Sequence, residues 1–249
     1  MDAMTTNRPK VLVILHNLDD NLNEMAGPLA EAGIDLVTWD VVRDVANTPA
    51  IADLGNFDGV ISLGAHAGVL EEAENPWMSH ERQIMEWALA TETPLLGLCF
   101  GSQLLASAAG GQVYKSETAE LGWTQVAMTE AAKADPVLST LGENPDVFHF
   151  HYDTFDLPES AELLGETNGI KQAFRVGNKA WGTQFHIEIG LSQQLSWLTS
   201  YRQDFEAEGL SIEDQVRQTH ERWIAHRDRS WAMGRAFAEQ VLAQAATRA

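Results

Sequence analysis

The sequence is poor in basic residues and in long apolar runs, and each shortage excludes a class of protein. It has 16 lysines and arginines against 36 aspartates and glutamates, which gives a formal net charge of −20. A surface of that sign repels phosphate backbones and anionic lipids, so we expect neither nucleic acid nor a membrane as a partner. No stretch approaches the roughly 20 apolar residues of a membrane span, and Met1–Lys10 lacks an apolar signal core.

Cysteine is nearly absent, since Cys99 is the only one in the chain. It cannot form an internal disulfide, and a lone thiol fits a reducing compartment, so we expect a soluble, cytoplasmic protein. Apolar residues make up 45% of the 249 positions, which is enough to bury a sizeable core. The composition therefore predicts one α/β domain of ordinary size with additions.

The surroundings of Cys99 indicate a reactive thiol. An apolar run begins after Pro94 and ends at Cys99, and the apolar residues that follow recur at helical spacing. This pattern predicts a buried strand, a sharp turn and a helix, with Gly97 and Gly101 allowing the backbone to turn tightly. At the start of a helix the positive potential favours a thiolate. The alternative is a buried structural cysteine.

A nucleophilic thiol needs a base, and the best candidate among the eight histidines is His186. The stretch Trp181–Glu188 alternates, which predicts a strand with His186 and Glu188 on one face. A carboxylate beside an imidazole fixes its tautomer and leaves the other ring nitrogen free to take the thiol proton. We therefore predict a triad of Cys99, His186 and Glu188. A surface ion pair is the alternative for the last two, and His66 is a second candidate base, although a loop histidine is usually solvated.

Alternating strands and helices predict the fold. The apolar stretches Val11–Leu15, Ile34–Val42 and Phe57–Leu63 are expected to be the first three strands. This order favours a doubly wound, mostly parallel sheet with flanking helices, whose active site lies at the carboxyl ends of the strands. Between the first two strands, Leu22, Met25 and Leu29 predict a helix that stops at Gly33, and Pro28 is expected to mark the start of its ordered part. Ser79 is expected to cap the helix before the Cys99 strand.

Beyond Gly111 the patterns become irregular. Gln112–Val126 predicts short strands and turns. Val147–Asp153 alternates, so that His149, His151 and Asp153 share a face that could bind a divalent metal, although no further ligand cluster accompanies it. A hairpin is expected between Ala173–Val176 and Ala180–Phe185.

The C-terminal part is helical in pattern. A stripe from Leu195 to Phe205 predicts one helix that ends at Gly209, and Ser211 opens a longer helix. Trp223 and Trp231 stand eight residues apart and mark an apolar helix face that must be shielded from water. We expect the protein's own sheet to cover this face, and a homodimer interface is the alternative. We divide the chain into a domain of residues 1–190 and a helical extension of residues 191–249 packed on it.

These motifs resemble those of a known family. Gly97–Gly111 (GLCFGSQLLASAAGG) and Gly182–Glu188 (GTQFHIE) are similar to the nucleophile and His-x-Glu motifs of class I (triad) glutamine amidotransferases. The nearest resemblance is to free-standing proteins similar to the amidotransferase domain of GMP synthase. It spans residues 10 to 190 and includes the segments Ile61–Ala65, Glu120–Trp123 and His151–Pro158.

The resemblance implies a flavodoxin-like fold with a small antiparallel patch, and it implies no cofactor or metal. It also implies that the backbone N–H groups of Gly64 and Phe100 form the oxyanion hole. The residues that it places around the substrate are Gln103, His151, Tyr152 and Asp153. Without the resemblance, Gln103 would be taken for a solvated glutamine at a helix start.

Three departures from the family pattern bear on function. Leu63-Gly64-Ala65 stands where the family has Gly-Gly-Pro, Ile187 replaces a proline, and Tyr152 replaces a glycine. Of these, Tyr152 is the one expected to narrow or cover the pocket and so to change the substrate.

The resemblance implies hydrolysis of the glutamine side-chain amide through a γ-glutamyl thioester, which gives glutamate and ammonia. A separate synthase subunit would receive the ammonia, since we expect no nucleotide-activating domain after residue 190. The alternatives are a γ-glutamyl peptide hydrolase with the same triad and a binding domain that no longer catalyses.

Overall fold

The computed structural model describes residues 8–248; most of the polar segment Met1–Lys10 discussed above lies outside that range. The strands are β1 Lys10–Leu15, β2 Asp35–Asp40, β3 Gly59–Ser62, β4 Leu95–Leu98, β5 Gln112–Gln125, β6 Ala127–Met128, β7 Asp146–Asp156, β8 Ala161–Thr167, β9 Ile170–Val176 and β10 Ala180–Thr183. The α-helices are α1 Asn23–Glu31, α2 Trp77–Thr91, α3 Phe100–Ala108, α4 Glu130–Lys133, α5 Leu191–Ser200, α6 Arg202–Ala207 and α7 Ile212–Ala246.

The centre of the molecule is an eight-stranded sheet in the order β2-β1-β3-β4-β10-β9-β8-β6. The first five strands are parallel, and β9, β8 and β6 extend the sheet in antiparallel fashion. The order of the parallel strands is that of flavodoxin-like folds, so the predicted doubly wound sheet is confirmed. The expected hairpin between β9 and β10 is also confirmed.

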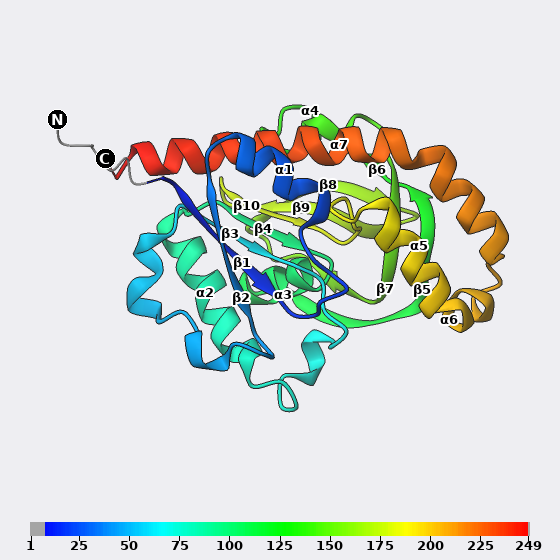
Figure 1. Cartoon of the computed structure of the whole chain (residues 1–249), viewed down its shortest axis with the longest axis horizontal. Coiled ribbons are helices and arrows are strands. Elements are labelled where there is room, and N and C mark those ends of the chain that lie inside the picture. The colour runs from blue at the N-terminus through cyan, green and yellow to red at the C-terminus, as the bar shows by residue number, and fades with distance from the viewer. Residues whose placement is uncertain (1–7, 249) are drawn as a thin grey trace.

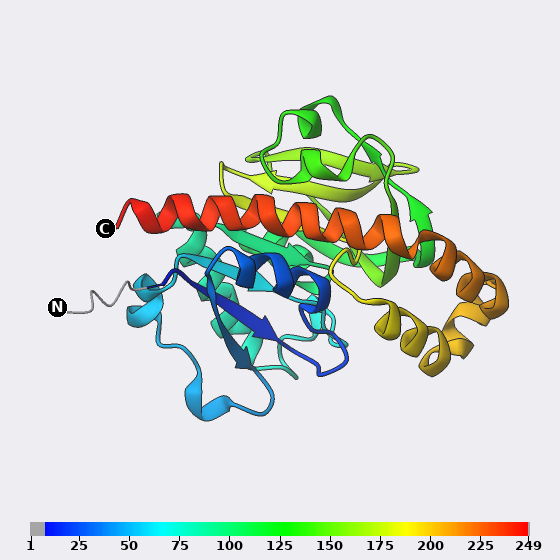
Figure 2. The same cartoon turned by 45° about the horizontal axis from the view of Figure 1, so that its top comes forward.

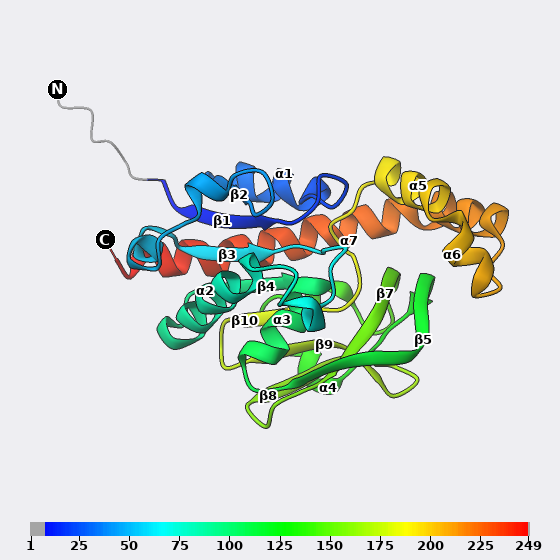
Figure 3. The ribbon, with the colours of Figure 1, turned by 90° about the horizontal axis from the view of Figure 1, so that it is seen from below.

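Helices cover both faces of the parallel half, with α1 and α7 on one side and α2 and α3 on the other (Figures 1 and 3). Successive residues of a strand point to opposite faces, so β1 sends Val13 into the core beneath α7 and Leu12 into the core beneath α3. This double cover explains why the strands are apolar throughout rather than alternating.

A second sheet of two strands, β5 and β7, stands apart from the first (Figure 3). It is the predicted antiparallel patch, but the expectation of several short strands in Gln112–Val126 is wrong. The segment forms one 14-residue strand whose register shifts between Lys115 and Glu120. That irregularity breaks the alternation on which the sequence prediction depended.

The C-terminal helices differ in two ways from their prediction. The stripe from Leu195 to Phe205 forms two helices, α5 and α6, broken at Tyr201. Trp231 lies against Gly27 of α1 and donates to Glu24 at 3.0 Å, so a helix rather than the sheet covers it. The predicted cap is confirmed, since Ser211 Oγ accepts from the Asp214 N–H at 3.2 Å.

Helix α7 is 35 residues long and runs across the whole molecule (Figure 2). Its Met233 and Phe237 share one core with the strand residue Leu96. The boundary at residue 190 remains a prediction. Among residues 8–248, no helix is both long and apolar enough to cross a membrane.

Both predicted helices are present, but the start expected at Pro28 and the cap expected at Ser79 are wrong. Helix α1 begins at Asn23 and contains Pro28, whose ring packs so tightly on α7 that a Cβ at Gly234 would lie 2.6 Å from Pro28 Cγ. Helix α2 begins at Trp77 after Pro76, so Ser79 lies inside the helix and does not cap it. The fixed φ of proline suits a helix start, and this signal outweighs that of the serine.

Candidate active site

Cys99 occupies the turn between β4 and α3, at the carboxyl end of the parallel strands. Its backbone has φ 51° and ψ −107°, a strained conformation for a residue with a side chain. Hydrogen bonds hold the turn, because the Cys99 N–H donates to the Thr183 carbonyl at 2.8 Å and the Ser102 hydroxyl donates to the Cys99 carbonyl at 2.7 Å. The predicted strand, turn and helix are therefore confirmed.

The two glycines beside the thiol are required by close backbone contacts. A Cβ on Gly97 would meet the Gly101 backbone at 2.5 Å, and a Cβ on Gly101 would collide with the Ser62 backbone. Both glycines thus let α3 start directly against the ends of β3 and β4.

His186 and Glu188 lie beside the thiol, in a segment that follows β10. The predicted strand over Trp181–Glu188 is too long, because β10 ends at Thr183 and only an isolated bridge joins His186 to Phe148. The pair forms nevertheless, with His186 Nδ1 2.7 Å from Glu188 Oε1 and both side chains buried. The remaining nitrogen, Nε2, is the one available to Cys99.

The electrostatics of the three residues are coupled. Burial alone would lower the pKa of His186, but the charge of Glu188, together with that of Cys99 and their hydrogen bonds, raises it well above its ordinary value. A raised pKa means that the imidazole holds a proton strongly once it has taken it from the thiol. The Trp197 ring meets the imidazole edge to face at 4.9 Å and shields it from solvent.

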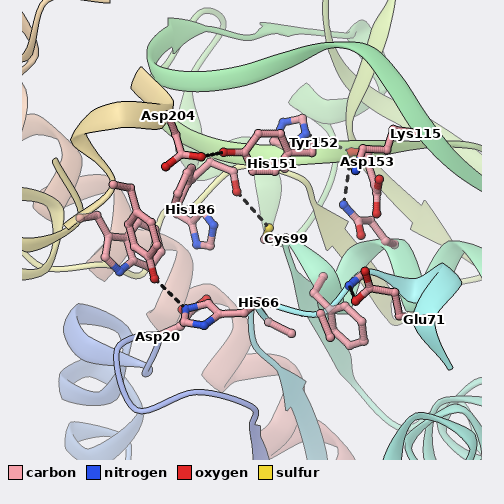
Figure 4. A pocket seen from close by; sticks show the side chains of 18 residues that line it. Asp20, His66, Glu71, Cys99, Lys115, His151, Tyr152, Asp153, His186 and Asp204 are labelled. Atoms are coloured by element: carbon pink, nitrogen blue, oxygen red, sulfur yellow. Dashed lines mark hydrogen bonds between the residues drawn. The ribbon is translucent and has the colours of Figure 1, made fainter. Parts of the chain in front are cut away.

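A cavity of about 250 Å³ opens in front of Cys99 and His186 (Figure 4). Its other walls come from the loop after β3, from β7 and from helices α5 and α6. The predicted residues Phe100, Gln103, His151, Tyr152 and Asp153 all line it.

Gln103 is buried rather than solvated, which excludes the alternative considered for it. Its amide nitrogen donates to Gln184 at 3.2 Å and to the Asp153 carbonyl at 3.3 Å. The Gln184 amide in turn lies 3.8 Å from Cys99 Sγ. Sequence reasoning missed Gln184, although it adjoins the His-x-Glu motif.

The mouth of the cavity carries charged and aromatic groups. Tyr152 donates to Asp204 of α6 at 2.8 Å, so the residue that replaces a family glycine joins the C-terminal helices across the opening. Lys115 of β5 and Glu71 lie near Asp153. Burial raises the pKa of Asp153 overall, and the charge of Lys115 opposes that shift. Neither Lys115 nor Asp204 was predicted, since both come from segments whose pattern was misjudged.

His66 lies at the rim of the cavity and not beside the thiol. Its side chain is 55% exposed, and Nε2 lies 3.0 Å from the Tyr201 hydroxyl and 3.2 Å from Asp19. These contacts explain its place at the mouth, and they favour His186 as the base.

Asp20 is a buried acid that sequence reasoning missed. Its carboxylate packs against Gly64 so closely that a side chain there would collide with it, and it lies within 4.8 Å of His186 and Glu188. Burial raises the pKa of Asp20 to about 7, while His186 opposes that shift. The only sequence signal was its position in the loop after β1, which it shares with other polar residues.

His149 and His151 gather with Glu120, and Asp153 is not part of the cluster. Potential ligand atoms of the three lie within 4.8 Å of one another, and His149 Nδ1 is 3.3 Å from His151 Nε2. Burial lowers the pKa of both histidines, that of His151 to about 3, and burial raises the pKa of Glu120. His151 lies 3.2 Å from Glu120 and its Nδ1 3.0 Å from the Asp153 carbonyl, whereas His149 Nε2 is buried without a hydrogen-bond partner among the described residues. Asp20, His186 and Glu188 form a second cluster of this kind, but His186 and Glu188 already bind each other.

The structure brings Ala65 to the cavity in addition to Phe100. Gly64 stands just behind it, next to Asp20 and His186. The oxyanion role assigned to Gly64 stays a prediction, and Ala65 becomes a second candidate.

The family model described as "Glutamine amidotransferase class-I" matches residues 14–200. This range includes Cys99, His186 and Glu188 and most of the residues that line the cavity. The chain belongs to the class I glutamine amidotransferase family. Its family comprises glutamine amidotransferases and related hydrolases.

Curated relatives of the class I family carry several activities in their names. A glutamine amidotransferase-like protein, YfeJ, of Salmonella typhimurium is 32% identical over 61% of this chain and 65% of its own length. The GMP synthase (glutamine-hydrolyzing) of Porphyromonas gingivalis is 34% identical over 57% of this chain and 27% of its own length. The γ-glutamyl-L-1-hydroxyisopropylamide hydrolase of a Pseudomonas species is 29% identical over 58% of this chain and 52% of its own length. The chain thus spans less than two thirds of each of these relatives.

Solved structures match over nearly the whole chain. A glutamine amidotransferase from Thermotoga maritima has a TM-score of 0.79 and 26% identity, and the match covers 93% of this chain and 99% of that protein. A glutamine amidotransferase from Methylobacillus flagellatus has a TM-score of 0.82 and 22% identity, with 94% and 95% covered. The second likeness concerns the fold alone.

Proposed function

We propose that this protein hydrolyses the side-chain amide of glutamine, or a related γ-glutamyl bond, through a thioester on Cys99. The observation that carries the proposal is the strained turn that holds Cys99 in the cavity, next to a histidine backed by a buried carboxylate 2.7 Å away. A thiol, a base and an orienting acid in this arrangement are what acyl transfer requires.

In the first step, Cys99 Sγ attacks the δ-carbon of the substrate while His186 takes the thiol proton. The N–H of Phe100 and one N–H of the loop after β3 hold the negative oxygen, an interaction worth about 3 kcal/mol per donor. His186 then returns the proton to the leaving nitrogen, and ammonia or an amine departs. Water, activated by the same imidazole, hydrolyses the thioester and releases glutamate.

The cavity suits a small amino-acid substrate. Its volume of about 250 Å³ is below the roughly 300–1,000 Å³ that is common for drug-sized ligands. Lys115 and Asp153 at its mouth offer opposite charges for an α-carboxylate and an α-ammonium. The acyl half of glutamine and that of a γ-glutamyl amide are identical, so these contacts serve both.

A γ-glutamyl amide hydrolase is the second candidate. Tyr152 lines the cavity and is joined to Asp204 of α6 at its mouth, and a Pseudomonas relative is named a γ-glutamyl-L-1-hydroxyisopropylamide hydrolase. If ammonia is the product, a synthase subunit is the proposed recipient. The third alternative, a binding domain without catalysis, is disfavoured by the complete triad.

The test is glutamate release from glutamine and from γ-glutamyl dipeptides by the native protein and by Cys99→Ala. We expect release by the native protein only, and the preferred substrate separates the two catalytic candidates. A glutamine analogue with an electrophile at the δ-carbon should label Cys99. An unlabelled thiol, or equal release by Cys99→Ala, would overturn the proposal.

A further inference from the structure

A second buried histidine–glutamate pair lies behind the wall of the cavity. His16, just after β1, has Nε2 2.8 Å from Glu81 of α2, and the Ser62 hydroxyl donates to the other Glu81 oxygen at 2.6 Å. All three side chains are buried, and none lines the cavity. The mechanism proposed above makes no use of them.

The remaining nitrogen of His16 faces the loop after β3, where Nδ1 lies 3.0 Å from the carbonyl oxygen of Gly64. A carbonyl only accepts hydrogen bonds, so Nδ1 carries the proton and donates it. Burial lowers the pKa of His16, but Glu81 and the Gly64 carbonyl raise it above its ordinary value overall. Both ring nitrogens are therefore occupied, and His16 has none left for catalysis.

The contact fixes the direction of one peptide plane. Among the residues described, no peptide bond is cis, and in a trans peptide the carbonyl and the next N–H point in opposite directions. Because the Gly64 carbonyl points at His16, the Ala65 N–H points away from it. Ala65 lines the cavity and His16 does not, so this N–H faces the cavity side.

The neighbouring peptides of the loop are held as well. The Leu63 N–H donates to the Ile14 carbonyl at 3.2 Å, and the Leu63 carbonyl accepts from the Gly101 N–H at 3.1 Å. The His66 N–H donates to Asn17 Oδ1 at 2.9 Å. Within residues 8–248 neither the Gly64 N–H nor the Ala65 N–H has such an acceptor, and of these two residues only Ala65 lines the cavity.

We propose that His16, held by Glu81 and Ser62, is a positioning residue that fixes the Gly64–Ala65 peptide so that the Ala65 N–H stabilises the oxyanion. The proposal rests on the proposed function and deepens it. If the peptide turned over, the Gly64 carbonyl would face the developing negative charge and oppose the reaction instead of assisting it.

Two substitutions at His16 separate its two contacts. The amide nitrogen of an asparagine takes the place of Nδ1 and can still donate to Gly64, whereas that of a glutamine takes the place of Nε2 and reaches only Glu81. His16→Gln therefore removes the contact to the loop, and His16→Asn keeps it. The variants and the native protein are compared by steady-state kinetics on glutamine and on a γ-glutamyl dipeptide. The rates are expressed per active site, and active sites are counted by labelling with the electrophilic glutamine analogue.

We expect His16→Gln to lower kcat about 100-fold with KM unchanged, as for the loss of one oxyanion donor, and His16→Asn to restore most of it. Alkylation of Cys99 by iodoacetamide, which needs no oxyanion donor, should proceed at the native rate in both. A purely structural role would reduce the yield of folded protein without this split between kcat and KM.

Crystal structures of the variants give a readout that does not depend on turnover. We expect a rotated Gly64–Ala65 peptide in His16→Gln and the native orientation in His16→Asn. A native kcat, or an unrotated peptide, in His16→Gln would overturn the proposal. If the native protein releases no glutamate from any γ-glutamyl compound, the proposed function fails, and the peptide orientation alone still decides on His16.

Discussion

Two histidine–glutamate pairs with nearly equal nitrogen–oxygen distances, one through Nδ1 of His186 and one through Nε2 of His16, lie on either side of the loop after β3. His186 is 2.7 Å from Glu188, and His16 is 2.8 Å from Glu81; all four side chains are buried. The difference is the second ring nitrogen, which faces Cys99 in the first pair and a backbone carbonyl in the second. The same pair of residues is thus suited to moving a proton in one place and to holding a backbone in the other.

The largest expected effect comes from the same substitution in each pair. His186→Asn keeps a donor to Glu188 but removes the nitrogen that accepts the thiol proton, so kcat should fall at least about 1,000-fold. His16→Asn keeps its functional contact and should retain most activity. Glutamate release by the two variants measures the contrast; equal losses would show that the pairs do not differ in role.

Replacing each glutamate by glutamine should affect mainly activity in one pair and mainly stability in the other. Glu188→Gln removes the main group that raises the pKa of His186, and we expect kcat to fall about 100-fold. Glu81→Gln breaks a buried ion pair and should cost about 3 kcal/mol of unfolding free energy, with a smaller loss of kcat. Kinetics and urea unfolding of the two variants provide the comparison, and a stability loss confined to Glu188→Gln would contradict it.

The stability effect of Glu81 should depend on pH. Folding raises the pKa of His16 above 6.5, so the folded state binds the proton more tightly than the unfolded chain. That stabilisation is complete below the unfolded pKa of 6.5 and is lost as the pH rises through the higher folded value. The difference in unfolding free energy between the native protein and Glu81→Gln should therefore be larger at about pH 6 than at about pH 9.

Asp20 lies between the two pairs and should produce an intermediate effect. The groups that act on its charge are His186, Glu188, His16 and Asp19, and its pKa is raised from 3.8 to about 7. Because the folded state binds this proton more tightly than the unfolded chain, the protonated carboxyl group stabilises the protein fully at a pH below the unfolded pKa of 3.8. The stabilisation is lost as the pH rises through the folded pKa of about 7. Asp20→Asn should remove this decline, which gives a gain of at least about 1 kcal/mol at alkaline pH relative to acid pH.

The pH profile of kcat offers a second measurement on Asp20→Asn. Ionised Asp20 favours the charged imidazole of His186, so its removal should lower the pKa of His186 and shift the profile to lower pH. Native and variant profiles that coincide, together with parallel pH–stability curves, would show that Asp20 does not act on the triad.

Ser62 should give the smallest effect. Its hydroxyl donates only to the Glu81 oxygen that His16 does not contact. Ser62→Ala should cost about 1 kcal/mol of unfolding free energy and leave KM unchanged. A loss of kcat as large as that of His16→Gln would mean that the hydroxyl, and not the imidazole, sets the loop.

The comparison also shows what the sequence could reveal. Cys99, His186 and Glu188 were predicted because they sit in short local patterns, an apolar run ending at a turn and an alternating stretch. His16 and Glu81 were missed because they lie 65 positions apart, and the loop after β1 meets α2 only in the folded protein. The parallel sheet followed from the order of apolar runs, whereas the long irregular β5 and the break at Tyr201 depend on tertiary contacts that no local pattern contains.

The most direct measurement is mass spectrometry of protein quenched in acid during turnover of glutamine or a γ-glutamyl amide. The account predicts a γ-glutamyl adduct on Cys99 in the native protein, increased when Glu188→Gln slows hydrolysis of the thioester and absent from Cys99→Ala. Substrate turnover without an adduct on Cys99, or with undiminished rate in Cys99→Ala, would contradict it.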